Sequence, residues 1–337
     1  MGTDGPTVQD RAFGVLFGFW SSQALLAAVK LGIADHLADG PRTAGELAAA
    51  MGAHEPSLAR LLRALATLEA VTSEGGRYGL TEFGRALVKG APGSMRSMIL
   101  GVMSEDHRRA WAELPHSVRT GETAFDRVYG MPVFEYYARH PDVSADFNDA
   151  MTAGSAAVEA AVREAFDFSP FGRIVDVGGG NGGLLAAALE AAPKAAGVLL
   201  GTPAGLKGAA DLLRARGVSE RCEVVPGDFF ESVPRGGDLY MLKWILHDWD
   251  DRRAGAILRN CREAAAKGSR LLVIEAVLPD GDAPSPGRLG DLNMMAMTGG
   301  RERSAAEYRA MIEAAGFVDV RARETRSPCG LVEAVAG

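Results

Sequence analysis

The sequence predicts an α/β protein in two parts: a seven-stranded, doubly wound, mostly parallel sheet with a reversed terminal strand, and before it an all-helical, winged-helix-like unit. Three observations lead to this fold class. A glycine-rich loop, GGGNGG at 178–183, joins an apolar strand to an alanine- and leucine-rich helix. From that loop onward, strand-like runs alternate with helical runs, as in parallel sheets. The last two strand-like runs are joined only by TRSPCG, which is too short for a parallel crossover, so they should pair antiparallel.

Residues 1–98 are expected to form the N-terminal unit. Residues 11–38 carry apolar side chains at helical spacing around much of the circumference, which is typical of helices buried in a core or against a second subunit. We therefore expect a homodimer. Thr43 and Glu46 fit a capping box at the start of a short helix.

A second helix, beginning at Pro56, precedes a hairpin signal at Gly75-Gly76. Helix, helix and hairpin form a winged-helix pattern, which favours packing or dimerisation here. A DNA-binding regulator is an alternative. It has little support, because the second helix offers only Arg60 and Arg63 as basic residues.

The composition indicates which kinds of partner the protein has and in which cellular compartment it is found. The formal net charge of −7 argues against a nucleic-acid partner. Three scattered cysteines fit a reducing cytoplasm, and their spacing suggests no metal site. The first residues lack the pattern of a secretory signal, and no uninterrupted apolar run reaches about 18 residues, so we expect no membrane span. We predict a cytoplasmic protein.

Residues 99–337 are expected to form the C-terminal domain, with a helical, substrate-side segment at 99–165 and the sheet at 166–337. Aromatic side chains between Phe125 and Tyr137 are expected to be mainly core, with a minority lining a pocket for a flat substrate. His107 and His116 flank Trp111, and contact with substrate or a metal is an alternative to a structural role for both. The predicted strands are 174–177, 197–200, 222–225, 238–243, 270–277, 317–323 and 330–335, and helices are predicted at 183–191, 204–216 and 252–266.

The glycine loop predicts a nucleotide-type ligand. Asp176 ends the strand before the loop, and Gly178 and Gly180 lie in the turn, where backbone N–H groups can approach a ligand closely. Such sites usually have a carboxylate at the tip of the next strand, about 20 residues on, to hold the ribose. That strand here ends in Gly201, and no acidic residue occurs between Glu190 and Asp211.

Further segments at predicted strand ends make a specific resemblance. In order they are GDFFESVP, LKWILHDWDD, VIEAVLP and DLNMMAMTGGRERS. Together with VDVGGGNG and the N-terminal helices, they resemble the small-molecule O-methyltransferases that use S-adenosylmethionine, a family of plant caffeate-type enzymes and bacterial antibiotic-tailoring enzymes. The resemblance covers nearly the whole chain. It implies a class I methyltransferase-like sheet and a small aromatic or polyketide-like substrate.

The resemblance also implies roles for residues of this sequence. His247 is the general base, and Glu275 and Glu302 orient it. The residues implied to contact the cofactor are Asp176, Gly178 and Gly180 at the loop, Gly201 at the ribose position, Asp228 and Phe229 at the adenine, Lys243 at the polar end, and Trp249 beside the adenine. A histidine titrates near neutral pH and can remove a phenol proton while the methyl group is held in line.

Gly201 departs from the family pattern, in which an aspartate holds the ribose hydroxyls, and this leaves cofactor affinity open. The leading hypothesis is O-methyl transfer. The alternative is an enzyme of the same fold that no longer transfers methyl but catalyses decarboxylation, hydroxylation or cyclisation, with weak or no cofactor binding. A nicotinamide dehydrogenase is disfavoured by the missing acid and by the reversed last strand.

Overall fold

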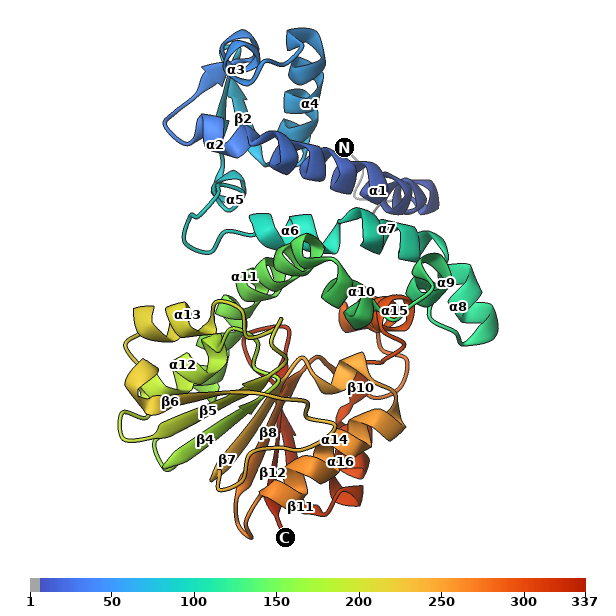
Figure 1. The fold of residues 1–337 in the computed structure, drawn as a ribbon. Coiled ribbons are helices and arrows are strands. Elements are labelled where there is room, and N and C mark those ends of the chain that lie inside the picture. The colour runs from blue at the N-terminus through green and yellow to red at the C-terminus, as the bar shows by residue number, and fades with distance from the viewer. Residues whose placement is uncertain (1–6) are drawn as a thin grey trace. The chain divides into compact units, whose positions relative to one another are not determined.

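A computed structural model describes residues 7–337. The chain divides into two compact units, Met1–Ser104 and Glu105–Gly337. Figure 1 shows the helices and strands of both. We expected a boundary after residue 98. That position lies inside helix α6 (Arg96–Val102), and the division falls after this helix instead. The two units are described separately.

The N-terminal unit contains the expected sequence of helices followed by a hairpin. Its elements are α1 (Val8–Leu31), α2 (Ile33–Leu37), β1 (Arg42–Thr43), α3 (Ala44–Met51), α4 (Glu55–Thr67), β2 (Val71–Glu74), β3 (Arg77–Leu80), α5 (Glu82–Arg85) and α6. Strand β3 lies between β1 and β2 and is antiparallel to both. The Thr43 side chain accepts from the N–H of Glu46, and Glu46 accepts from the N–H of Thr43, so the capping box is present.

Helix α1 exposes large apolar side chains along its first half. Phe19 and Trp20 are 64% and 65% exposed, and Phe17 lies between Phe13 and Trp20 with ring centroids 5.5 Å and 4.7 Å apart. Only its C-terminal part contributes buried residues. An isolated chain leaves this apolar face in contact with water, although we expected it to be buried in a core or against a second subunit.

The same helix is the one candidate membrane span within residues 7–337, judged by length and composition, with a mean hydropathy of 1.6. We expected no span because polar residues interrupt the apolar run. Core helices of soluble proteins and signal sequences meet the same criterion, so the finding is weak evidence for a membrane.

The C-terminal unit opens with five helices: α7 (Glu105–Ala112), α8 (Leu114–Thr120), α9 (Ala124–Tyr129), α10 (Val133–Arg139) and α11 (Pro141–Ala165). The aromatic residues predicted here form a small core of their own. Phe125 and Tyr137 are buried within it together with Met297 from α15 (Gly287–Met297), and Tyr129 and Tyr136 pack against them.

The sheet has seven strands in the order β11-β12-β8-β7-β4-β5-β6. Their bounds are β4 (Arg173–Val177), β5 (Ala196–Gly201), β6 (Cys222–Pro226), β7 (Leu239–Lys243), β8 (Arg270–Glu275), β11 (Phe317–Arg323) and β12 (Gly330–Ala336). The five strands from β6 to β8 pair in parallel, and β12 is antiparallel to both β8 and β11. The predicted reversed last strand is confirmed.

Two apolar cores cover the two faces of the sheet. Strand side chains point alternately to opposite faces. On one face Val175 and Leu242 pack with α14 (Asp251–Ala264) and α16 (Ala305–Ala314), and on the other Ile174 and Met241 pack with α11, α12 (Gly183–Ala191) and α13 (Ala209–Ala215). Burial on both faces leaves the carboxyl ends of the parallel strands as the place for a ligand site.

Two predicted elements differ from the structure. The helix predicted at 204–216 begins at Ala209, because Gly208 precedes it in a left-handed conformation with φ +83°. The strand predicted at 270–277 ends at Glu275. The next two residues, β9 (Val277–Leu278), pair instead with β10 (Arg303–Ser304).

Candidate active site

The glycine loop lies directly against the tip of β5. The N–H groups of Gly178 and Gly179 both donate to the carbonyl of Leu200, at 2.8 and 3.2 Å. Gly178 has φ +73°, and a Cβ there would lie 2.5 Å from Ile245. Gly180 also has a positive φ, +57°, but no atom lies within 4 Å of its would-be Cβ. The loop is therefore packed on one side and open at Gly180.

Two ionisable side chains lie at the strand ends near this loop, Asp176, which is buried, and Lys243, which is half-buried. Asp176 is 0% exposed, and neither of its carboxylate oxygens has a hydrogen-bond partner within residues 7–337. Burial raises the pKa of Asp176 to about 7, although the nearby Lys243 ammonium acts to lower it. Lys243 donates to the hydroxyl of Ser155 on α11 at 2.7 Å, and burial lowers its pKa. A polar, ionic ligand group fits this set, because it would supply partners that the buried carboxylate lacks.

The backbone turns sharply after Lys243. Trp244 has φ +55°, which is unfavourable for a bulky side chain. Its indole lies 4.2 Å from the Lys243 Nζ, and its Nε1 donates to the thiol of Cys329 at 3.1 Å. The turn directs the next two N–H groups, those of Ile245 and Leu246, to Glu275 Oε1, each at 2.9 Å.

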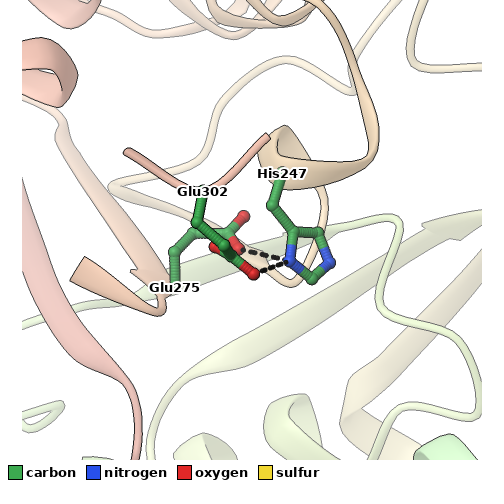
Figure 2. Close-up of side chains that lie close together, drawn as sticks. All are labelled: His247, Glu275 and Glu302. Atoms are coloured by element: carbon green, nitrogen blue, oxygen red, sulfur yellow. Dashed lines mark hydrogen bonds and ion pairs between the residues drawn. The ribbon is translucent and has the colours of Figure 1, made fainter. Parts of the chain in front are cut away.

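Figure 2 shows His247, Glu275 and Glu302 together, as the sequence predicted. Nδ1 of His247 is 2.9 Å from Oε1 of Glu302 and 3.5 Å from Oε2 of Glu275. The carboxylates can only accept when ionised, so Nδ1 carries the proton and Nε2 is left to accept another. Nε2 lies 3.8 Å from Asp248 Oδ1. The histidine side chain is 14% exposed, whereas Glu275 is 0% exposed.

One imidazole and three carboxyl groups meet in this cluster. Burial acts to lower the pKa of His247, but the charges of Glu275 and Asp248 and the hydrogen bond that Nδ1 donates to Glu302 outweigh it and raise the pKa to about 10. Burial raises the pKa of Glu275 to about 7 and that of Asp248 to about 6, although the His247 charge lowers both. His247 is therefore a stronger base than free histidine.

Strand β10 brings the parts of this cluster together. The N–H of Arg301 donates to the carbonyl of His247 at 2.8 Å. Arg303 is fully buried and donates to the carbonyls of Leu246 and Trp249 at 3.0 and 2.8 Å. A Cβ at Gly300 would lie 2.0 Å from the His247 carbonyl oxygen, so a glycine is needed for this close approach.

The residues predicted around the adenine also gather at strand ends. The ring of Phe229 is 6.3 Å from that of Trp249, edge to face, and lies against the would-be Cβ of Gly178. Asp228 is exposed, and one of its oxygens accepts from the Phe230 N–H at 2.8 Å. A flat ring system with an exocyclic amine fits such a group of aromatic faces beside an exposed carboxylate.

Several residues of the site were missed from the sequence. Ser155 contacts Lys243 across 88 positions of chain, and Arg303 contacts Leu246 across 57, so no local pattern signals either contact. Asp248 faces His247, whereas Asp250 caps the helix that follows.

The other two histidines considered, His107 and His116, interact with residues close to them in the sequence. His116 pairs with Glu122 at 3.1 Å, and His107 is buried on α7 with a lowered pKa caused by that burial. Ligand atoms of His247, Glu275 and Glu302 lie within 4.8 Å of one another, which is also compatible with a metal ion.

The fold and this site define a class I methyltransferase: a seven-stranded sheet with a reversed last strand, a glycine loop, and a histidine–carboxylate cluster at the strand ends. The family model of the O-methyltransferase domain matches residues 111–318, and that of the O-methyltransferase dimerisation domain matches residues 13–90. The chain belongs to the S-adenosylmethionine-dependent O-methyltransferase family.

Similar proteins support this assignment. Phenazine O-methyltransferase PhzM of Lysobacter antibioticus is 43% identical over 321 residues, covering 95% of this chain and 94% of the relative. O-demethylpuromycin-O-methyltransferase of Streptomyces alboniger is 41% identical over 332 residues, covering 96% and 86%. The structure of CalO1, a methyltransferase of calicheamicin biosynthesis in its S-adenosylhomocysteine-bound form, has a TM-score of 0.87 at 35% identity, covering 99% of this chain and 100% of that one.

Proposed function

We propose that this chain methylates a hydroxyl group of a small aromatic or polyketide-like metabolite, with His247 as general base. The single observation that carries the proposal is the geometry of that histidine. Its Nδ1 is hydrogen-bonded to Glu302, so in the neutral imidazole Nε2 is the atom that takes a proton. The raised pKa of His247 brings its basicity close to that of a phenol, which titrates near pH 10 in its free form.

The cofactor, when bound, supplies an electrophilic methyl group. The chain's own residues do the rest. Glu302 holds the imidazole ring and its tautomer, and Glu275 adds a second negative charge that stabilises the imidazolium once Nε2 has taken the substrate proton. Glu275 is itself held by the N–H groups of Ile245 and Leu246, so the base has a fixed position.

We assign the cofactor site to the carboxyl ends of β4, β5, β6 and β7. Gly178 and Gly180 form the backbone cradle, and Asp176 and Lys243 meet the polar, methionine end. At the other end Asp228, Phe229 and Trp249 meet the adenine. Support comes from the buried, unpartnered carboxylate and from the open space at Gly180.

We also propose that the protein is a cytoplasmic homodimer, without a membrane or nucleic-acid partner. The exposed aromatic face of α1 falls within the match to the dimerisation domain. Burying such a face against a second copy removes apolar surface from water. The acidic net charge of −7 opposes binding to nucleic acid.

The decisive test is methyl transfer by the purified protein. The relatives named above are described as acting on phenazines and on O-demethylpuromycin. A panel of hydroxyphenazines, O-demethylpuromycin and hydroxylated naphthoates would be incubated with S-adenosylmethionine and analysed by mass spectrometry for an added methyl group.

The matched control is His247→Gln, which keeps a polar side chain but removes the base. It should lose transfer while binding S-adenosylhomocysteine as the wild type does. Cofactor binding with every panel member returned unmethylated would instead favour a reaction without methyl transfer. Undiminished transfer by His247→Gln would remove His247 from its proposed role.

A further inference from the structure

The tip of strand β5 lacks the acidic side chain that nucleotide sites of this topology use. In such sites a carboxylate about 20 residues beyond the glycine loop accepts the ribose hydroxyls. Gly201 is the last residue of β5, next to Leu200, whose carbonyl accepts from both Gly178 and Gly179. The glycine therefore borders the loop at the position where the ribose acid is expected.

A leucine takes up the space beside this glycine. A Cβ at Gly201 would lie 3.2 Å from Cδ2 and 3.3 Å from Cγ of Leu206, closer than ordinary contact. Leu206 is partly buried and packs against the core that contains Leu199. Its position is held by a turn, because its N–H donates to the Thr202 carbonyl at 2.9 Å and the Gly205 N–H donates to the Thr202 hydroxyl at 3.2 Å.

No neighbouring acid along the chain replaces the missing one. The stretch from Gly201 to Gly208 has no Asp or Glu, and Asp211, the next acidic residue, pairs with Arg214 at 2.8 Å on helix α13. The atoms nearest a Cβ at Gly201 are those of Leu206, and the Thr202 hydroxyl already accepts a hydrogen bond inside its own turn. The polar side chain that reaches this turn from elsewhere in the chain is Asn148, an amide, which donates to the Ala204 carbonyl at 3.4 Å.

We propose that Gly201 and Leu206 form a ribose subsite that does not select for the ribose hydroxyls, so that the chain accepts adenosyl ligands whose ribose lacks its 2′ or 3′ hydroxyl. The inference rests on the proposed function, because it concerns the same cofactor site. Affinity then comes from the adenine end, at Asp228 and Phe229, and from the polar end, at Lys243. The ligand class is adenosyl thioethers and sulfoniums modified on the ribose.

The test is a comparison of binding constants by isothermal titration calorimetry. The probes are S-adenosylhomocysteine and its 2′-deoxy and 3′-deoxy forms. Because a hydrogen bond to a charged group is worth about tenfold or more in affinity, a carboxylate clamp would separate these ligands by at least that factor. For the wild-type protein we expect dissociation constants that agree to within about threefold, since no charged group receives the hydroxyls.

A variant restores the acid. Gly201→Asp combined with Leu206→Ala places a carboxylate at the β5 tip and removes the side chain that would meet it; β5 is extended at this residue, so the backbone accepts aspartate. This double variant should prefer the unmodified ribose by about tenfold. Leu206→Ala alone is the matched control and should stay as unselective as the wild type.

The outcomes are distinguishable from those of the proposed function. The ribose inference is wrong if the wild-type protein binds the unmodified ligand and binds the deoxy forms at least about tenfold more weakly, which is the scale of one charged hydrogen bond. That result leaves methyl transfer intact. Failure of all three ligands to bind overturns both. If the double variant does not fold, the comparison on the wild type decides alone.

Discussion

Replacing Arg303 with methionine tests how the two segments that carry the acid–base cluster are held together. The guanidinium is 0% exposed and joins β10, next to Glu302, to the turn that carries His247. Its Nη groups donate to the carbonyls of Leu246 and Trp249, and its Nε and Nη2 donate to Asp251 at 3.0 and 2.8 Å. Methionine fills a similar volume without any of these donors.

The expected loss of stability in Arg303→Met depends on whether each acceptor finds a new hydrogen-bond partner once the guanidinium is removed. The carbonyls of Leu246 and Trp249 each lose a hydrogen bond from Arg303, one buried and one half-buried, and each loss costs about 1–3 kcal/mol of stability. Asp251 is 62% exposed and recovers water, so it adds little. The free energy of unfolding should therefore fall by about 2–5 kcal/mol. A loosened base should also lower kcat/KM by about 100-fold.

A neighbouring arginine supplies the control. Arg301 is 44% exposed, and its ion pairs with Asp251 and Glu307 lie at the surface, where such pairs contribute about 0–1 kcal/mol. Arg301→Met makes the same change of charge. Urea unfolding, read from the midpoint and slope, gives the difference for each variant. A loss in Arg303→Met no larger than in Arg301→Met would refute the argument that the buried guanidinium holds this site.

Three further predictions concern His247, Gly300 and Trp20. Because carboxylates raise the pKa of His247 to about 10 and only its unprotonated form can accept a proton, kcat/KM should increase with pH up to about pH 10. Glu302→Gln should move that increase to lower pH, and an unshifted pH–rate profile would contradict the assignment. Gly300→Ala should cost about 1–3 kcal/mol in urea unfolding and reduce kcat/KM, since its Cβ meets the His247 backbone; wild-type values would exclude this packing constraint. If the protein is the proposed dimer, Trp20→Asp should convert it to a monomer in light scattering with an unchanged circular dichroism spectrum, and a persistent dimer would exclude α1 as the interface.

The sheet could be predicted from local patterns because its strands are buried on both faces and occur as continuous apolar runs between turns. Local glycine patterns likewise predicted the glycine loop and the hairpin at β2 and β3. It failed where a long-range partner decides the local structure. Ala276 interrupts the predicted strand 270–277 because Val277 pairs with Arg303, which no local pattern reveals. A second failure has a local cause: the helix predicted from residue 204 starts late because Gly208 takes a left-handed conformation.

The residues of the proposed site could be named from the sequence, but the contacts that support them could not. His247, Glu275 and Glu302 come from three separate segments, and their meeting was expected only from the resemblance to known enzymes. Arg303 reads in the sequence as one more surface arginine, and its complete burial depends on carbonyl groups that become available only after the turn at His247 has formed. Buried polar contacts of this kind can be recognised only from the structure, because their partners are far apart in the sequence.

The left-handed backbone of Trp244 has a consequence for attempts to make this enzyme more robust. A non-glycine residue at φ +55° costs about 1–3 kcal/mol, and the surrounding structure has to maintain it. Selection for thermal stability alone would favour glycine or asparagine at this position. Either replacement would remove the indole from the ammonium of Lys243 and the thiol of Cys329. At Trp244, therefore, thermal stability and the geometry of the turn that leads to His247 are in direct conflict, and a stabilised variant should keep this residue unchanged.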